Sequence, residues 1–315
     1  MTTALITHTD CLTHITPEGH PERVARLDYI LAALEGKDVL RVDAPLGQEA
    51  NILRVHPQAH LDHIRGSTPS EGAIPLDADT WMSPGSYTAA LRAVGGAVHG
   101  VDMVMTGDAQ NAFVACRPPG HHAESATPMG FCLFGNVSIA AKHALDHHGL
   151  SRVAVVDFDV HHGNGTQDLL QSDARVLFCS SQQIPLWPGS GHANETGHHG
   201  NVVNVPLAEG CNSAAFRRAM ETHVLPAVDA FAPELVLISA GFDAHRADPL
   251  AGLRLETEDF AWITQKLCDL AGAHCEGRVV SCLEGGYDLQ ALAESAAAHV
   301  DVLIENGAGH SGTGA

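Results

Sequence analysis

Residues 153–165 read VAVVDFDVHHGNG, an apolar run that ends in two aspartates and two histidines. A continuous run of small and β-branched apolar residues is typical of a strand that is buried on both faces, as in a parallel sheet. In extended backbone the side chains alternate, so Asp157, Asp159 and His161 are expected to point to one side. Burying two carboxylates is costly unless a cation or hydrogen-bond donors satisfy them. The segment therefore predicts a buried strand that ends at a polar site.

Similar apolar runs recur along the chain and alternate with segments of helical periodicity. The predicted strands are 111–116, 152–159, 175–180, 235–240 and 278–283, and the predicted helices are 22–34, 86–101, 137–147, 214–231, 258–273 and 289–304. This alternation predicts an α/β fold, with a single-domain open parallel sheet and helices on both faces in a three-layer α/β/α arrangement. The domain is expected to span 1–304, and the Gly-rich residues 305–315 are expected to form a flexible C-terminal tail.

Composition narrows the classes of function open to the 315-residue chain. Its 37 acidic and 17 basic residues give a formal net charge of −20, which disfavours direct nucleic-acid binding and favours a cationic substrate. Solubility is an equally good explanation of that charge. The sequence shows neither a membrane-spanning apolar run nor a secretory leader, so we expect a cytoplasmic protein with no membrane partner. The eight cysteines lack C-x-x-C spacing, which favours reduced thiols over disulfides or a thiolate metal site.

Polar residues follow four of the predicted strands at their carboxyl ends. The segments are RPPGHHA at 117–123, VHHGNG at 160–165, GFDAH at 241–245 and EGGY at 284–287. Ligand sites in open α/β sheets lie beyond the carboxyl ends of the strands, so the four segments predict one shared site. Two other histidine pairs, 147–148 and 198–199, lack this context and are expected at the surface.

Asp159 and His161 supply half of a metal site, and Asp243, at the end of another strand, is a suitable third ligand. Three protein ligands and a free position for water are typical of catalytic zinc sites. Oxygen and nitrogen ligands without cysteine are also compatible with Fe²⁺ or Co²⁺. Taken singly, a D-x-D-x-H pattern is more often a structural polar cluster, and an aspartate after a strand more often caps a helix. Four polar strand ends in one chain favour the metal site.

Six motifs in this chain resemble the histone deacetylase superfamily, which includes bacterial deacetylase-like amidohydrolases and acetylpolyamine amidohydrolases. The motifs are RPPGHHA (117–123), GFC (130–132), VDFDVHHGNGTQD (156–168), NVPL (204–207), SAGFDAHRADPLAG (239–252) and LEGGY (283–287). The similarity extends from His20 to about Tyr287, which is most of the chain. Asn164 and the LEGGY motif are similar to class II members and their bacterial relatives.

The resemblance implies an arginase/deacetylase-like fold and a hydrolase that removes an acetyl group from an acetylated amine. It implies Zn²⁺ on Asp159, His161 and Asp243, together with tandem histidines, their partners and an oxyanion donor. The implied catalytic residues are His121, His122, Asp157, Asn164 and Tyr287. A structural K⁺ or Na⁺ is implied at Asp157, Asp159, His161 and Ser180.

A channel for an acyl-lysine side chain is also implied by the resemblance. Its implied substrate-binding residues are Gly130, Phe131, Trp187, Leu250 and Asp79, with Asp77 as the alternative to Asp79. Leu250 stands where a polyamine-selective relative has a glutamate, and an apolar residue there favours acetyl-lysine over acetylpolyamine. His14 and His20 fall in the implied rim loop, where they could contact substrate, but a surface position is expected for both.

Amide hydrolysis needs a base that takes a proton from water and an acid that protonates the leaving amine. A carboxylate such as Asp157 favours the charged form of its histidine partner, whereas the neutral Asn164 does not. His122 is therefore predicted to be the base and His121 the cationic acid, although the sequence leaves the reverse assignment open. Tyr287 follows two glycines and is predicted to donate a hydrogen bond to the oxyanion.

Other functions stay open on sequence grounds. Hydrolysis of an acetylpolyamine or another small N-acetyl compound would use the same groups. A catalytically inactive acyl-amine sensor would not need a proton shuttle, and an arginase-like enzyme would need a second metal and more carboxylates near Asp243. The native metal, the acyl-chain preference, the physiological substrate and homo-oligomerisation are left open.

Overall fold

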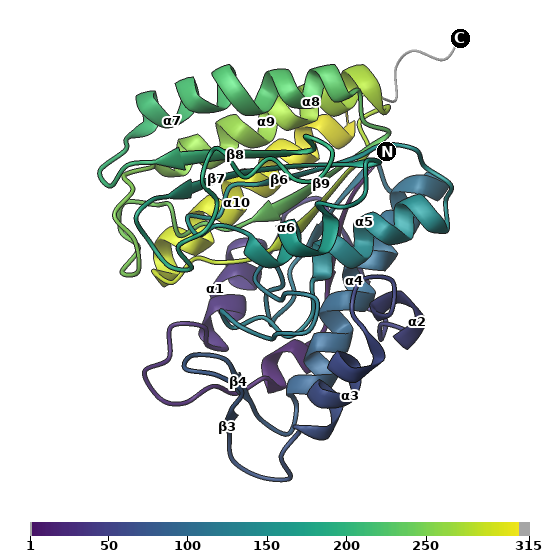
Figure 1. Cartoon of the computed structure of the whole chain (residues 1–315), viewed down its shortest axis with the longest axis vertical. Coiled ribbons are helices and arrows are strands. Elements are labelled where there is room, and N and C mark those ends of the chain that lie inside the picture. The colour runs from purple at the N-terminus through teal and green to yellow at the C-terminus, as the bar shows by residue number, and fades with distance from the viewer. Residues whose placement is uncertain (1, 309–315) are drawn as a thin grey trace.

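The computed structural model describes residues 2–308 and contains one eight-stranded sheet (Figure 1). All recorded strand pairings in this sheet are parallel. The strand order is β2-β1-β5-β10-β9-β6-β7-β8. The strands are β1 (Thr3–Thr7), β2 (Leu40–Asp43), β5 (Asn111–Val114), β6 (Val153–Asp157), β7 (Val176–Gln183), β8 (Val202–Leu207), β9 (Leu235–Ala240) and β10 (Val279–Leu283).

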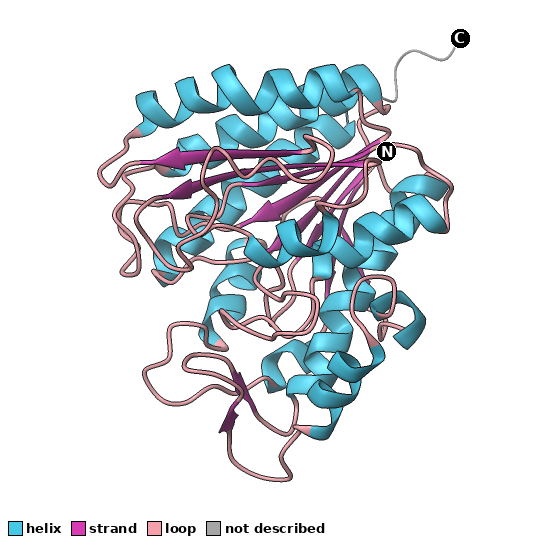
Figure 2. Cartoon of the chain, in the orientation of Figure 1, coloured by secondary structure: helices cyan, strands magenta, loops and turns pink. Residues whose placement is uncertain are grey.

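Helices cover both faces of the sheet, as Figure 2 shows. One face carries α1 (Ala25–Ala33), α9 (Thr257–His274) and α10 (Leu289–Ala308), and the other carries α4 (Ser86–Thr106), α5 (Asn136–Asp146) and α6 (Asn164–Leu170). A continuous helical segment formed by α7 (Ser213–Ala219), a π-helical turn (Met220–Val224) and α8 (Leu225–Phe231) lies next to α9. The predicted α/β fold, a parallel sheet between two helical layers, is confirmed.

Several elements of the structure were not predicted from the sequence pattern. β2 and β8 are the two edge strands, and each carries polar residues or a proline, so neither has the continuous apolar run of a central strand. The short strand β1 is also absent from the predicted elements. Between β2 and α4 the chain forms α2 (Glu49–Ile52), α3 (Gln58–Gly66) and the antiparallel pair β3 (Ile74–Pro75) and β4 (Trp81–Met82).

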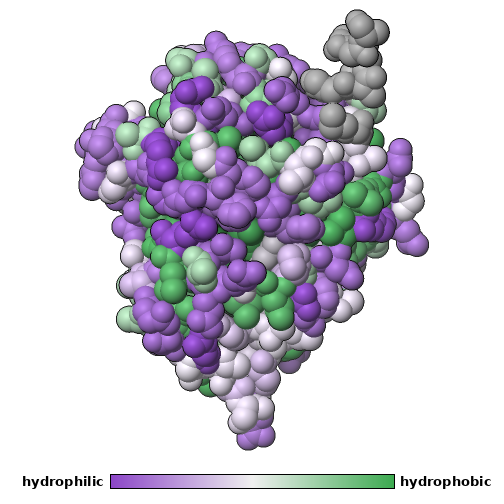
Figure 3. All heavy atoms as spheres, turned by 90° about the vertical axis from the view of Figure 1, so that its right-hand side faces the viewer, coloured by the Kyte–Doolittle hydropathy of each residue, from purple (hydrophilic) through white to green (hydrophobic). Residues whose placement is uncertain are grey.

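Two hydrophobic clusters hold the layers together. The larger lies between the sheet and its helices and includes the fully buried Val155 and Ile238. The smaller includes Ile52, Ile64 and Phe134 and packs α2 and α3 against α4. The side that lies on the right in Figure 1 is mostly hydrophilic, with apolar side chains in separate patches (Figure 3). Within residues 2–308, no helix has the length and apolar character needed to cross a membrane.

The register of the sheet places the polar strand ends at one edge. Asp157, the last residue of β6, lies opposite Ser180 of β7 and Ser239 of β9. Ser239 in turn lies opposite Cys282 of β10, which lies opposite Val114 of β5. The segments that follow β5, β6, β9 and β10 therefore leave neighbouring strands at the same edge, where open α/β sheets bind ligands.

The C-terminal region is helical to the end of the described residues. Helix α10 ends at Ala308, so residues 305–308 of the expected tail belong to this helix, and Gly307 is buried. Residues 309–315, the rest of the expected tail, lie outside the described residues. The domain division at residue 304 stays a prediction.

Candidate active site

Two aspartates and a histidine meet beyond the edge of the sheet. Asp159 and His161 lie in the loop after β6, and Asp243 lies in the loop after β9. One ligand atom from each lies within 4.8 Å of the other two. Nδ1 of His161 is 3.2 Å from Oδ1 of Asp159 and 3.2 Å from Oδ2 of Asp243. Both aspartates are fully buried, so the loops concentrate two carboxylates and one imidazole in a place of low solvent access.

Backbone amides orient these carboxylates. The N–H of Gly285 donates to Oδ2 of Asp159 at 2.8 Å, and the N–H of Val160 donates to Oδ1 of Asp243 at 2.8 Å. Although burial opposes it, the two carboxylates raise the pKa of His161 to about 10, while burial and the Asp159 charge raise the pKa of Asp243 to about 7. When no ion is bound, these shifts favour a protonated imidazole between the two carboxylates. Because a divalent ion could replace that proton, the donor set fits a metal.

Two glycines leave the space that the carboxylates occupy. A Cβ atom at Gly241 would overlap the carboxylate of Asp159, and a Cβ atom at Gly285 would overlap the carboxylates of Asp243 and Asp159. Neither glycine is among the residues with positive φ. Space for the carboxylates, rather than an unusual backbone conformation, therefore explains glycine at these two positions.

His121 and His122 lie beside this set and have different partners. Nδ1 of His121 is 2.9 Å from Oδ2 of Asp157, and Nδ1 of His122 is 2.8 Å from Oδ1 of Asn164. Burial opposes charge on His121, but the carboxylates of Asp159 and Asp157 hold its pKa well above the usual range. Burial, reinforced by the charge of His121, places the pKa of His122 well below the usual range. A cationic and a neutral imidazole therefore lie side by side, with ring centroids 3.8 Å apart.

Tyr287 lies in the segment that follows β10, beside the residues described above. Its ring meets Phe131 edge to face with centroids 5.8 Å apart, and the guanidinium of Arg26 is 5.0 Å from its ring centroid. Its backbone N–H donates to Oδ2 of Asp248 at 2.7 Å. Burial and the Asp243 carboxylate raise the pKa of the Tyr287 hydroxyl well above its usual range, so the hydroxyl keeps its proton and can donate a hydrogen bond.

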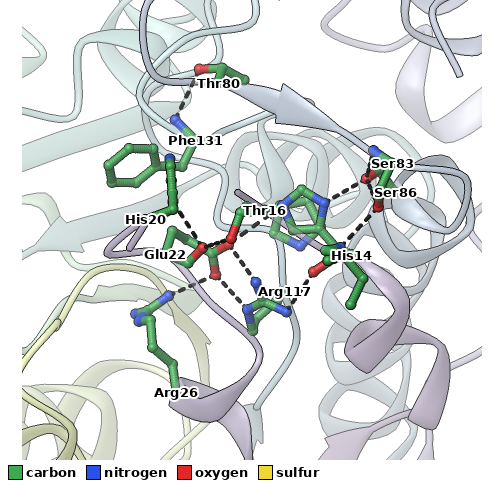
Figure 4. Close-up of polar contacts among 12 residues, drawn as sticks. His14, Thr16, His20, Glu22, Arg26, Thr80, Ser83, Ser86, Arg117 and Phe131 are labelled. Atoms are coloured by element: carbon green, nitrogen blue, oxygen red, sulfur yellow. Dashed lines mark hydrogen bonds and ion pairs between the residues drawn. The ribbon is translucent and has the colours of Figure 1, made fainter. Parts of the chain in front are cut away.

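A buried ion network lies next to the site and was not predicted from the sequence. Figure 4 shows Glu22 between Arg26 and Arg117. Arg117 donates from Nε and Nη2 to the two oxygens of Glu22 at 2.5 and 2.6 Å, and Arg26 donates from Nη1 at 3.1 Å. Burial opposes ionisation of Glu22, but Arg117, His14 and Arg26 hold its pKa well below the usual range. The carboxylate is therefore charged and fully paired.

This network fixes the backbone of two loops of the candidate active site. Arg26 also donates to the carbonyl oxygens of Gly286 at 2.6 Å and Glu284 at 2.5 Å, in the segment that leads to Tyr287. Oε2 of the buried Glu284 accepts the N–H groups of Gly120 and His121 at 2.7 and 3.1 Å. Arg26 and Glu284 thus fix the backbone that leads to Tyr287 and the backbone at His121. Glu284 lies within LEGGY, so the motif was a signal that could have identified it.

The expected surface position of His14 is wrong. His14 is 1% exposed, and its Nδ1 lies 2.7 Å from the hydroxyl oxygen of Ser86 (Figure 4). Its Nε2 lies 3.4 Å from Glu22, so the ion network accounts for its burial. His20 is half-buried and contacts the ring of Phe131 with centroids 4.8 Å apart. It lines the cavity described next rather than the open surface.

A cavity of about 330 Å³ opens above the site. The predicted substrate-binding residues all line it: Gly130, Phe131, Trp187, Leu250 and Asp79. The ring of Trp187 meets that of His122 edge to face at 4.6 Å. A Cβ atom at Gly130 would overlap both rings. Phe131 has a φ of 68° and donates its N–H to the Thr80 hydroxyl at 3.1 Å, so a strained backbone is held in place at the cavity wall.

Asp79, and not Asp77, lines the cavity. Oδ1 of Asp77 accepts the N–H groups of Asp79 at 3.0 Å and Thr80 at 2.6 Å, which makes it the stabilising residue of a local turn. The carbonyl of Asp79 lies 2.9 Å from Nε2 of His20. Burial and the nearby Asp77 charge raise the pKa of the Asp79 side chain.

Ser180 lies one strand away from the site, opposite Asp157 in the register. It is fully buried, and its hydroxyl oxygen has no hydrogen-bond partner among the described residues. Oδ1 of Asp157 accepts the N–H of Asp159 at 3.1 Å. An unsatisfied hydroxyl beside a buried carboxylate fits a site for a monovalent cation.

Comparison with known proteins agrees with this geometry. The chain matches the model of the histone deacetylase domain over residues 20–303. A probable deacetylase of Archaeoglobus fulgidus is 35% identical over 299 residues, covering 92% of this chain and 82% of that protein. A histone deacetylase-like amidohydrolase of Pseudomonas aeruginosa is 39% identical over 278 residues, covering 85% and 73%. The crystal structure of the HDA15 HD domain matches with a TM-score of 0.91 at 34% identity, covering 97% of this chain and 89% of that chain. This chain therefore belongs to the histone deacetylase superfamily and is a hydrolase of the deacetylase type.

Proposed function

We propose that the chain is a Zn²⁺-dependent deacetylase that acts on acetyl-lysine. The observation that carries the proposal is the convergence of Asp159, His161 and Asp243 beside two histidines of different charge, at the base of an apolar cavity. A protein that only binds an acyl group would need the cavity but not the paired histidines. Neighbouring titratable groups whose pKa values diverge are typical of acid–base catalysis.

Asp159, His161 and Asp243 are the proposed ligands of the Zn²⁺ ion. When bound, the ion would lower the pKa of a water molecule and polarise the amide carbonyl. Fe²⁺ and Co²⁺ accept the same ligand types, so metal analysis of the purified protein belongs to the test. A structural K⁺ or Na⁺ is proposed on Asp157, Asp159, His161 and Ser180, supported by the unsatisfied Ser180 hydroxyl.

Two histidines and a tyrosine are the proposed proton carriers and donor. The neutral His122 takes the proton from the attacking water, and Asn164 holds its other ring nitrogen. The cationic His121, held by Asp157, supplies the proton to the leaving amine, which is too basic to leave as an anion. Tyr287 donates its hydroxyl hydrogen to the oxygen that gains charge during the attack.

The cavity supports acetyl-lysine as the substrate. Phe131, Trp187 and Leu250 present apolar surface to an aliphatic side chain. Asp79 lies on the same wall and could accept backbone N–H groups of a peptide. Leu250 supplies no charge that would attract the second ammonium group of an acetylpolyamine. The net charge of −20 favours basic peptides around the acetylated residue.

Turnover of a matched substrate panel tests this function. An acetyl-lysine peptide, N-acetylspermidine and N-acetylputrescine are assayed with Zn²⁺-loaded and chelator-treated protein side by side. The expected result is turnover that is lost with the chelator, restored by Zn²⁺ and greatest for the peptide. Faster turnover of the acetylpolyamines would show that these, and not acetyl-lysine, are the substrate class. Turnover that the chelator does not affect would exclude the metal mechanism.

A further inference from the structure

A second group of side chains with metal-binding atoms lies where α4 packs against the end of α5. Asp102 lies near the end of α4, His143 lies in the last turns of α5, and His147 and His148 directly follow that helix. One ligand atom from each of the four lies within 4.8 Å of the other three. None of the four belongs to the candidate active site.

Two imidazoles of this group already converge on one carboxylate oxygen. Oδ1 of Asp102 lies 2.6 Å from Nε2 of His143 and 2.8 Å from Nε2 of His148. A cation between these atoms would be bound by both nitrogens and by the carboxylate. The same three residues would stay in contact with one another. The arrangement is therefore a preformed convergence of donor atoms.

His147 completes the set through helical spacing. Its backbone N–H donates to the carbonyl of His143 at 2.9 Å, so the helical path continues and the two rings lie on one face. These rings stack with centroids 4.7 Å apart and an angle of 16°, and the ring of His148 stands at 83° and 88° to them. Histidines four residues apart on one helix face are a spacing that binds zinc.

The group has one buried side and one exposed side, so an ion could reach it from solvent and still contact a buried ligand. His143 is 5% exposed, whereas Asp102 and His148 are half-buried and His147 is exposed. A cavity of about 370 Å³ is lined by Asp102, His143 and His147, and also by His99, which lies three residues before Asp102 on α4. Three of the four residues thus line a cavity that has space for water.

The local charge does not exclude a cation. Arg54 lines the same cavity, but its guanidinium forms an ion pair with Asp146 at 3.5 Å. Asp146 lies next to His147 in the sequence and is also 3.1 Å from Arg175. The carboxylate of Asp102 adds a negative charge directly at the convergence point.

We propose that Asp102, His143, His147 and His148 form a second metal site, which binds a divalent transition ion such as Zn²⁺. Three imidazoles and one carboxylate suit Zn²⁺, Cu²⁺ and Ni²⁺ better than Mg²⁺ or Ca²⁺. Four protein ligands are typical of structural rather than catalytic zinc. Bound there, the ion joins α4 to α5 and stabilises the folded state.

The number of bound ions tests the site. The full chain is equilibrated with excess Zn²⁺, desalted and analysed for zinc and protein. The double variant His147→Ala/His148→Ala is expected to hold one ion per chain fewer than the wild type. The control is His198→Ala/His199→Ala, which removes an exposed histidine pair outside the group and is expected to match the wild type. His143 is left intact because its ring is packed in the interior.

A thermal scan supplies the second readout. Added Zn²⁺ is expected to raise the Tm of the wild type and of the His198/His199 control more than that of the His147/His148 variant. Deacetylation by that variant should stay at the wild-type level, because neither residue lies near the active site. Equal zinc content in the wild type and the His147/His148 variant would overturn the proposal. An equal loss of zinc in the control would also overturn it, because the ion would then depend only on exposed histidines.

Discussion

At the scale of single residues, Asp243 joins two loops. Its Oδ1 accepts the N–H of Val160, and its Oδ2 faces Nδ1 of His161. Asp243→Asn keeps the shape and the first contact but removes the charge that a metal ligand needs. We expect kcat/KM to fall by more than the roughly 10–100-fold that loss of an outer-shell partner costs, and the zinc content to fall with it. Zinc analysis and kinetics on the same sample check this. Full activity with full zinc content would contradict the assignment of Asp243 as a ligand.

Tyr287 presents a different case, because its hydroxyl is proposed to act mainly in the transition state. Tyr287→Phe keeps the ring contacts with Phe131 and Arg26 and removes only the donor. Loss of one oxyanion donor typically lowers kcat by about 10²–10³. KM is expected to change little, because ground-state binding does not depend on the hydroxyl. Steady-state kinetics with an acetyl-lysine peptide separate the two. A raised KM at unchanged kcat would make Tyr287 a binding residue.

At the scale of elements, the loop after β10 depends on Gly285. A side chain there would overlap two carboxylates, so Gly285→Ala should displace Asp159 or Asp243 and weaken zinc binding strongly. The matched control is Gly66→Ala at the end of α3, where a Cβ atom would meet nothing within 4 Å. Zinc affinity measured by competition with a chelator should fall only in the Gly285 variant. Similar affinities in both variants would show that the loop can relax around the added methyl group.

The strands and their ends could be predicted because two simple rules agree. Central parallel strands are continuous apolar runs, and their carboxyl ends meet at one edge, so Asp159 and Asp243 could be placed together without a structure. The partners of the tandem histidines, Asp157 and Asn164, are predicted by the family resemblance and not by these two rules. The edge strands β2 and β8 escaped prediction because an edge strand mixes polar and apolar residues.

The ion network could not be predicted, for a different reason. Glu22 and Arg117 are charged residues, which are usually exposed. They lie 95 residues apart in the sequence, and only their ion pair offsets the free-energy cost of burying both charges. His14 is buried beside them because it contacts the Glu22 carboxylate. Pairing of this kind depends on tertiary distance, which residue patterns do not contain. The same holds for Asp102 and His143, which come together from two helices.

At the scale of the whole molecule, the residues of the candidate active site come from two regions. One is the set of loops that follow the central strands, and the other is the segment between β2 and α4, which contributes Asp79 to the cavity. Asp79 and Thr80 lie in the turn that joins β3 and β4. The Thr80 hydroxyl accepts the backbone N–H of Phe131, which also lines the cavity. The proposed catalytic groups lie on short loops that leave neighbouring central strands. These proposed catalytic groups are therefore anchored to the buried sheet, whereas the proposed substrate-binding residues Trp187 and Leu250 lie on more exposed segments.

The stability of the molecule should depend on pH in a way that reports the metal. Without an ion, the carboxylates of Asp159 and Asp243 raise the pKa of His161 to about 10, against about 6.5 in an unfolded chain. A group whose pKa is raised by folding contributes stability that is complete below its unfolded pKa and is lost as pH rises towards its folded pKa. Metal-free protein should therefore lose stability between pH 7 and 9, by up to about 1.4 kcal/mol per pH unit from this residue.

Zinc should remove that loss, because a ligating imidazole is neutral and proton competition for the site weakens as pH rises. Urea unfolding of chelator-treated and Zn²⁺-loaded protein at pH 7, 8 and 9 measures the two slopes. The free energy of unfolding is expected to fall with pH in the first sample and to hold or rise in the second. His161→Asn serves as the control, because it lacks the titrating group and should give a smaller slope without metal. Parallel slopes for the two wild-type samples would mean that His161 is not the group that the ion replaces.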